Sequence, residues 1–144
     1  MTNMAFEILA DITVVVHTKH PPNDDEWEAY LTSHAPFFDR GMGWRFAIFT
    51  DGGAPTAVQR MKMNEMVADW MRRNPDCIRS AIITKSAFVR GVVTAIGWFR
   101  PIARAFSPDN LDQALAYLDV PAARLGEIQI LVPKLKAKLT PDGR

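Results

Sequence analysis

The stretch WRFAIFTDGGAPTAVQRMKMNEMVADWMRRN, residues 44–74, decides the fold class of this 144-residue chain. It begins with a short apolar run, typical of a buried strand, turns at Gly52 and Gly53, and restarts as a helix over 57–73. Five apolar residues share one face of that helix: Met63, Met66, Val67, Trp70 and Met71. Met61 lies away from this face. A strand, a glycine turn and an amphipathic helix in succession predict one unit of an α/β protein.

The rest of the chain continues the alternation of strands and helices. The expected strands are 4–10, 12–18, 44–50, 80–86 and 103–107. A first helix is expected after a cap at Asn23 or Asp24, and a third helix is expected from a Ser86 cap to residue 99. The other expected helices are 57–73, 108–118 and 122–139. Pro36 should end or kink the first helix, Pro55 should lie in the first turn of the second, and Pro133 should bend the last.

This order predicts a mostly parallel five-stranded sheet, opened by a β-hairpin, with helices packed on it. We expect a single domain over 1–144, with its core at about 4–118 and an extra C-terminal amphipathic helix at about 122–139. The apolar face of that last helix must cover the domain or join two chains.

Composition is that of a soluble globular protein, with 48% hydrophobic and 23% charged residues. No apolar stretch is long enough to span a membrane, and the first residues lack the basic start of a secretory signal. Cys77 is the single cysteine, so no internal disulfide can form. These features predict a cytoplasmic protein that is not an integral membrane protein.

Charge is nearly balanced overall, at +1, but it is unevenly distributed. Between Arg79 and Arg104 the chain carries five basic residues and no acid; the other three are Lys85, Arg90 and Arg100. This segment is modestly electropositive. Neither the total charge nor basic clustering with aromatic residues supports nucleic-acid binding.

The glycine turn leaves two interpretations open. Asp51, Gly52, Gly53 and Thr56 could form an anion-binding turn at a helix start, or simply a tight turn that needs a positive φ. The lysine of a phosphate-binding loop and the third glycine of a dinucleotide fingerprint are both missing. The spacing of the three histidines supplies no metal set. We expect no metal, no cofactor and no catalytic set.

The helix at 86–99 carries two stripes. Its expected core stripe consists of Phe88, Val89, Val92, Val93, Ala95, Ile96 and Phe99. Another face consists of Ala87, Gly91, Thr94 and Trp98, three small residues and a tryptophan. This second face either packs closely against the helix at 57–73 or forms a shallow contact surface for a partner helix, an acyl chain or a peptide.

Several quoted motifs resemble the SpoIIAA-like, STAS/Sec14-type family of small bacterial domains over about residues 4–118. They are the opening hairpin, DDEWEAYL at 24–31, the strand ending in Asp51, SAFVRGVVTAIGWF at 86–99 and RAFSPDNLDQALAYL at 104–118. The resemblance implies a non-enzymatic module that binds proteins or lipids. In anti-sigma-factor antagonists of the wider superfamily, a phosphorylated serine follows the Asp that ends the third strand. Here Gly52 and Gly53 stand at that place, and glycine has no hydroxyl to phosphorylate.

These observations lead to three functional hypotheses. The first is a regulatory or scaffolding module that binds a partner protein or a second copy of itself, with contacts at Met61, Arg90, Gly91, Thr94, Trp98 and Arg100. The second is a carrier of a lipid or another acyl or anionic ligand, with a cavity beneath 88–99 and head-group contacts from Arg90, Arg100 or Arg104. The third is a small enzyme using Asp51 with His17 or His34.

Overall fold

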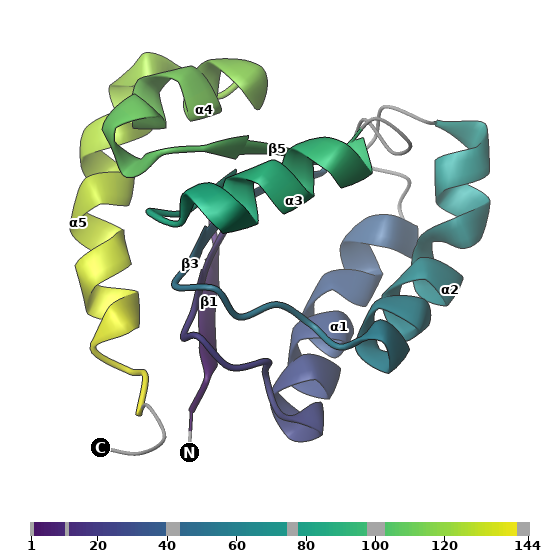
Figure 1. The fold of residues 1–144 in the computed structure, drawn as a ribbon. Helices are drawn as coiled ribbons and strands as arrows, with labels where there is room; N and C mark the ends of the chain where they lie inside the picture. The colour runs from purple at the N-terminus through teal and green to yellow at the C-terminus, as the bar shows by residue number, and fades with distance from the viewer. Residues whose placement is uncertain (1, 11, 40–43, 75–77, 98–102, 141–144) are drawn as a thin grey trace.

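The computed structural model describes residues 2–10, 12–39, 44–74, 78–97 and 103–140. Within these residues the chain folds as alternating strands and helices (Figure 1). The strands are β1 (Met4–Ile8), β2 (Ile12–His17), β3 (Trp44–Thr50), β4 (Ile78–Ile83) and β5 (Ala103–Phe106). The α-helices are α1 (Asp24–Asp39), α2 (Ala57–Arg73), α3 (Ala87–Gly97), α4 (Leu111–Tyr117) and α5 (Leu125–Lys136), and short 3-10 helices at Pro108–Asn110 and Ala122–Arg124 precede the last two.

The strands form one sheet in the order β1-β2-β3-β4-β5. β1 pairs antiparallel with β2, and each later strand pairs parallel with the strand before it. The predicted α/β class, with a mostly parallel sheet opened by a hairpin, is confirmed. Helices cover both faces of this sheet: α1 and α2 lie on one side and α4 and α5 on the other (Figure 1).

Alternate side chains of the strands point into two cores. On the side of α4 and α5, Val14 and Val16 of β2 belong to the same buried cluster as Leu115 and Ile128. On the side of α1 and α2, the intervening Val15 belongs to a cluster that is rich in aromatic residues: Trp27, Tyr30, Trp44, Phe46 and Trp70. β2 is buried on both faces, and its centre, Val14–Val16, is accordingly an unbroken apolar run rather than an alternating pattern.

The predicted amphipathic helix at the end of the chain is present as α5 together with the short helix before it. α5 buries Ile128, Leu131 and Leu135 and packs against β1 and β2. Of the two roles that the sequence left open for this apolar face, covering the domain is the one that the structure shows.

The structure corrects the prediction that Pro36 ends a helix and the predicted place of Pro55, and it places Pro133 within the last helix. Pro36 lies inside α1, which continues to Asp39. Pro55 lies before the first turn of α2, because Thr56 is the N-cap of that helix. Pro133 lies inside α5, which runs to Lys136. Cys77 falls outside the described residues. No helix in the described part of the chain has the length and apolar character needed to cross a membrane.

Candidate functional site

The start of α3 is held by two local interactions. The Ser86 hydroxyl accepts a hydrogen bond from the backbone N–H of Val89 at 3.1 Å, so the predicted cap is present. The half-buried Arg90, which is the one charged residue in the sequence of this helix, donates from Nη1 to the carbonyl oxygen of Thr84 at 2.8 Å. The charge of Arg90 is therefore turned back toward the end of β4.

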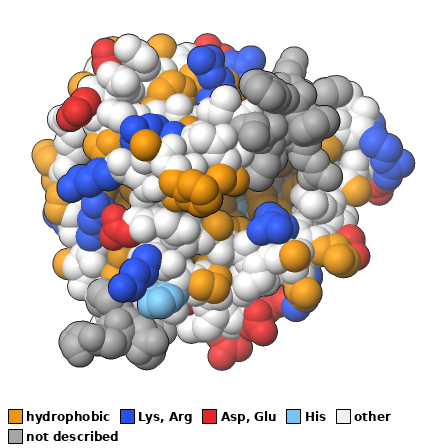
Figure 2. Space-filling view, in the orientation of Figure 1, with side chains coloured by type: hydrophobic (Ala, Val, Ile, Leu, Met, Phe, Trp, Pro, Cys, Tyr) orange, Lys and Arg blue, Asp and Glu red, His pale blue; other side chains and the backbone are white. Residues whose placement is uncertain are grey.

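The outward face of α3 is consequently uncharged. Ala87, Phe88, Gly91, Val92 and Thr94 are all exposed. Phe88 retains 80% of its accessible surface and Val92 42%. The Thr94 hydroxyl donates to the carbonyl oxygen of Arg90 at 2.9 Å, so its hydrogen is used within the helix. In Figure 2 a hydrophobic patch lies over α3, with Lys and Arg side chains on either side of it.

This exposure corrects the predicted core stripe of α3. Phe88 and Val92 were expected to be buried but are exposed, and Val89 and Val93 are only half-buried. The side chains of Ala95, Ile96 and Phe99, the other members of the predicted stripe, lie outside the described part of the structure. The helix packs along β5, which is the edge strand of the sheet, and an edge strand offers a helix only a narrow contact surface. Periodicity correctly predicts an apolar stripe, but it does not say how much of that stripe the sheet can cover.

The small-residue face of α3 also lies open where the structure describes it. A Cβ atom added at Gly91 would meet nothing within 4 Å. The described members of this face, Ala87, Gly91 and Thr94, are solvent-exposed rather than packed closely against α2. Met61 of α2 is 57% exposed. Trp98 and Arg100 lie outside the described residues, so the structure does not place these two candidates.

The glycine turn uses its polar groups within the chain. The Thr50 hydroxyl accepts from the N–H of Gly52 at 3.0 Å and donates to the carbonyl of Gly53 at 2.6 Å. The N–H of Gly53 donates to the carbonyl of Thr18 at 2.9 Å. The N–H of Thr56 donates to the side chain of Gln59 at 2.9 Å. These three amides already have acceptors, and Gly52 has a φ of 125°, which is the positive value that a tight turn was expected to need.

The groups of the enzyme hypothesis sit in different surroundings. Asp51 is exposed in the turn, whereas His17 and His34 are buried. Burial lowers the pKa of His17 to about 4. His34 Nε2 lies 2.8 Å from the Thr13 hydroxyl, and its Nδ1 lies 2.8 Å from the carbonyl oxygen of Tyr30.

The tautomer of His34 follows from its partners. Because a carbonyl can only accept, Nδ1 carries the hydrogen that is donated to Tyr30. The Thr13 hydroxyl accepts from Trp44 Nε1 at 2.7 Å and is therefore free to donate its own hydrogen to Nε2 of His34. Burial lowers the pKa of His34, opposed by its hydrogen bond to Tyr30. His34 is therefore neutral, and the hydrogen bonds of its two ring nitrogens join α1 to the sheet. In the described part of the chain, no group of three His, Cys, Asp or Glu side chains could hold a metal ion.

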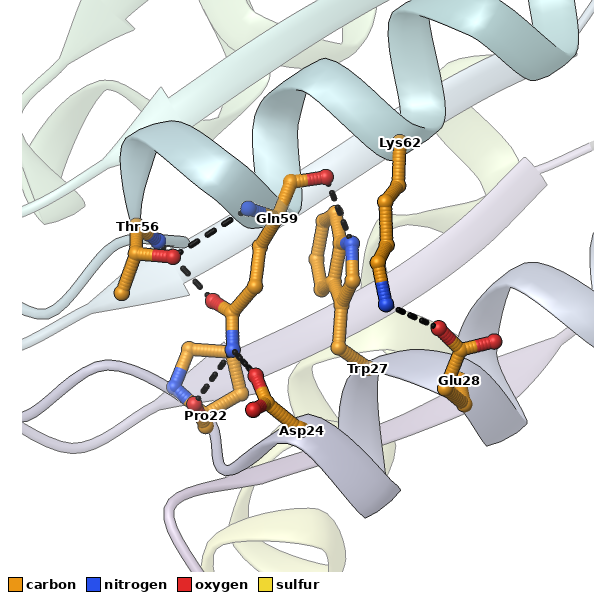
Figure 3. A network of polar contacts seen from close by, with 7 residues as sticks. All are labelled: Pro22, Asp24, Trp27, Glu28, Thr56, Gln59 and Lys62. Atoms are coloured by element: carbon orange, nitrogen blue, oxygen red, sulfur yellow. Dashed lines mark hydrogen bonds and ion pairs between the residues drawn. The ribbon is translucent and has the colours of Figure 1, made fainter.

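Between α1 and α2, Gln59 lies at the centre of a network of polar contacts (Figure 3). Its amide donates to the carbonyl of Pro22 at 2.9 Å and to the Asp24 carboxylate at 3.1 Å. The backbone carbonyl of Gln59 accepts from the indole of Trp27 at 2.8 Å. The sequence analysis does not predict that Gln59 links α1 to α2. The Thr-x-x-Gln pattern at 56–59 is a capping-box signal that could have drawn attention to this residue.

Beside this network lies an open hollow of about 360 Å³ between α1 and α2. Its lining residues are Glu28, Leu31, Thr32, Ala35, Lys62 and Met66. Lys62 and Glu28 form an exposed ion pair at 2.8 Å across it. The hollow is shallow and is not beneath α3, where the lipid-carrier hypothesis expects a cavity.

Comparison with family models, curated proteins and solved structures finds no match to this chain.

Proposed function

We propose that this chain is a non-enzymatic regulatory or scaffolding module that binds a partner protein or a second copy of itself through α3. The observation that carries the proposal is the outward face of α3, where Phe88 and Val92 lie one turn apart, exposed, on a surface without charge. A single exposed apolar residue is normal on a protein surface. An adjacent pair on an uncharged helix face is typical of a contact surface.

Three features support docking of another helix on this face. Gly91 follows Phe88 and precedes Val92 and Thr94 in α3, and a Cβ added at Gly91 would meet nothing within 4 Å. The backbone of a partner helix could therefore approach α3 closely at this position. Arg90 is turned toward Thr84 and therefore does not interrupt the apolar surface. Met61 on α2, which was predicted as part of the contact, is a third exposed apolar residue.

The proposal includes the STAS-like identity and a cytoplasmic, bacterial setting. Both rest on the resemblance of the quoted motifs and on the composition of the chain. A regulatory binding module is the function that this resemblance implies, and the exposed α3 face is compatible with it.

The test compares serine substitutions at two exposed apolar residues. Phe88→Ser removes the centre of the proposed surface, and Ile130→Ser on α5, whose side chain is 63% exposed, is the matched control. Native mass spectrometry and sedimentation velocity measure self-association, and affinity capture from native cells measures partner binding. We expect Phe88→Ser to weaken either self-association or partner binding by about tenfold or more. Ile130→Ser should leave the same interaction unchanged.

Stability must stay unchanged for this comparison to hold. Because both side chains are exposed, each substitution should change the free energy of unfolding by about 0.5 kcal/mol or less. The proposal fails if the wild-type chain neither self-associates nor captures a protein, or if Phe88→Ser and Ile130→Ser behave alike. A native mass that exceeds the mass of the chain, with the excess lost on denaturation, would favour a carried ligand instead.

A further inference from the structure

The strand β1 forms one edge of the sheet, next to β2. In an antiparallel pair, the backbone groups of successive residues face the neighbouring strand and the outside in turn. The N–H of Thr18 donates to the carbonyl of Asn3 at 3.0 Å, and the N–H of Leu9 donates to the carbonyl of Ile12 at 2.8 Å. The odd-numbered residues 3–9 therefore face β2. The backbone groups that face away from the sheet are those of the even-numbered residues, Met4, Phe6 and Ile8.

The chain itself covers the beginning of this edge. Thr140 donates its N–H to the carbonyl of Thr2 at 3.0 Å, and its hydroxyl accepts from the N–H of Thr2 at 2.6 Å. These bonds hold the two ends of the chain near each other (Figure 1). The carboxylate of Glu26 accepts from the N–H groups of Asn3 at 3.0 Å and Met4 at 3.4 Å. It takes the place that a carbonyl of an added strand would occupy, so this part of the edge is protected.

The second half of the edge lacks such cover. In the described part of the chain, the carbonyl of Met4 and the N–H and C=O groups of Phe6 and Ile8 have no hydrogen-bond partner. The side chains of Phe6 and Ile8 are half-buried and pack against the aromatic cluster under α1 and α2. An uncovered edge with apolar side chains is a template for pairing with another strand.

We propose that β1 is a dimer interface, at which two copies of this chain pair antiparallel about a two-fold axis at Phe6. In this register the N–H of Phe6 donates to the Phe6 carbonyl of the second copy, and the N–H of Ile8 donates to the Met4 carbonyl of the second copy. The axis repeats both bonds in the opposite direction. Each uncovered donor of β1 thus has an acceptor, and the two sheets become one continuous sheet.

The charge and the cover of β1 fit a second copy in this register. Glu7 is the one charged residue in the sequence of β1, and it lies opposite Ala5 of the second copy. An axis at Glu7 would place two glutamates directly opposite each other, which is destabilising. An axis at Ala5 would bring Ile8 opposite Thr2, whose outer edge Thr140 already covers.

The first test uses the unmodified chain. NMR follows the hydrogen exchange of single backbone amides at about 50 μM and about 1 mM protein, and sedimentation velocity measures the dimer over the same range. We expect the amides of Phe6 and Ile8 to exchange at least about tenfold more slowly at the higher concentration, because the dimer protects them.

Ala105 on β5, at the other edge of the sheet, is the internal control for this measurement. The carbonyl of Phe106 accepts from the N–H of Thr84 at 3.1 Å, so Phe106 faces β4 and the preceding amide of Ala105 faces away from the sheet. The exchange of Ala105 should be the same at both concentrations.

The second test removes one donor of the interface. Ile8→Pro deletes an N–H that the dimer uses and the pairing with β2 does not, and proline is tolerated at such a place on an edge strand. We expect the dissociation constant of the dimer to rise about tenfold or more, since each copy loses a hydrogen bond. Ile8→Ala keeps the N–H and is the matched control, which should dimerise nearly as well as the wild type.

Phe88→Ser separates this interface from the surface on α3. Pairing through β1 leaves α3 free, so Phe88→Ser should not change the dissociation constant of the dimer. The proposal is overturned if the chain is monomeric at about 1 mM, if the amides of Phe6 and Ile8 exchange equally at both concentrations, or if Ile8→Ala weakens the dimer as much as Ile8→Pro. A dimer that Phe88→Ser dissociates and Ile8→Pro leaves intact would overturn it too, while supporting the function proposed for α3.

Discussion

At the turn between β3 and α2, two neighbouring glycines are required for different reasons. Gly52 has a φ of 125°, but a Cβ added there would meet nothing within 4 Å. A Cβ at Gly53 would lie 2.3 Å from the carbonyl oxygen of His20 and 2.4 Å from that of Thr18. The second position therefore forbids a side chain by contact with backbone atoms, which cannot rotate away.

Alanine substitutions at these two positions should separate conformational strain from steric conflict. We expect Gly52→Ala to lower the free energy of unfolding by about 1 kcal/mol. Gly53→Ala should cost about 2 kcal/mol or more, because the loop must shift and its hydrogen bond from Gly53 to Thr18 must lengthen. Urea unfolding of both variants measures the difference. Equal losses would contradict the steric explanation for Gly53.

The sequence predicts one of these glycines better than the other. A positive φ in the turn was expected because two glycines follow a strand and precede a helix, and Gly52 is the residue that adopts it. The constraint on Gly53 comes from carbonyls at the end of β2, which are distant in the chain. The same holds for His34, whose partner Thr13 lies on a strand that local spacing cannot connect to it.

Among the elements, α1 and α2 are joined by a residue that belongs to both. Gln59 is the third residue of α2 and completes the capping box with Thr56, while its amide nitrogen donates to the N-terminal end of α1. Glutamate is equally suited to this position of a capping box. It cannot donate to the Pro22 carbonyl, however, and its charge would face the Asp24 carboxylate.

Gln59→Glu should therefore destabilise the protein at neutral pH although it preserves the capping box. We expect a loss of about 2 to 3 kcal/mol, because a buried acceptor loses its donor and two like charges meet. Glu65→Gln, an exposed change on the same helix, is the control and should alter stability by about 0.5 kcal/mol or less. Denaturant unfolding at pH 7 checks both. If Gln59→Glu is as stable as the wild type, the capping box contributes more to the free energy of unfolding than the hydrogen bonds from Gln59 to α1.

Some element boundaries follow closely from local sequence and others do not: the fourth strand was predicted at 80–86, whereas β4 runs from Ile78 to Ile83. β3 and α2 match the predicted residues because turn, cap and apolar periodicity all coincide there. The apolar stripe of α3 was predicted as core, which is wrong for Phe88 and Val92 because both are exposed. Its outer residues are exposed because α3 lies along an edge strand, and periodicity contains no information about strand order.

For the whole molecule, the alternation of strands and helices was sufficient to predict a mostly parallel sheet. It was not sufficient to bring Arg79 and Arg104 together, because their meeting depends on the register between β4 and β5 and on where α4 ends. The basic segment could be recognised in the sequence as a charge run. In the fold, Arg90 is turned toward β4, whereas Arg79 and Arg104 both lie over the Tyr117 ring, and local sequence does not predict this division.

Acid should weaken the folded molecule through His17. Its pKa falls from 6.5 to about 4 on burial, so the unfolded chain binds the proton more readily than the folded one. The stability that His17 contributes is therefore complete above pH 6.5 and is lost as the pH falls toward 4. The maximum slope is about 1.4 kcal/mol per pH unit, and the total is up to about 3 kcal/mol. The lowered pKa of His34 acts in the same direction.

Removing the titrating group should remove this part of the pH dependence. His17→Leu keeps a side chain of similar volume in a buried position, and His20→Leu, at a half-buried histidine, is the control. The free energy of unfolding is measured in urea at pH 7.5, 6.5, 5.5 and 5.0. We expect the wild type and His20→Leu to lose stability steeply below pH 6.5, and His17→Leu to lose it more gradually, because the lowered pKa of His17 no longer contributes to the pH dependence. Parallel curves for the wild type and His17→Leu would show that His17 takes up its proton equally well in the folded protein.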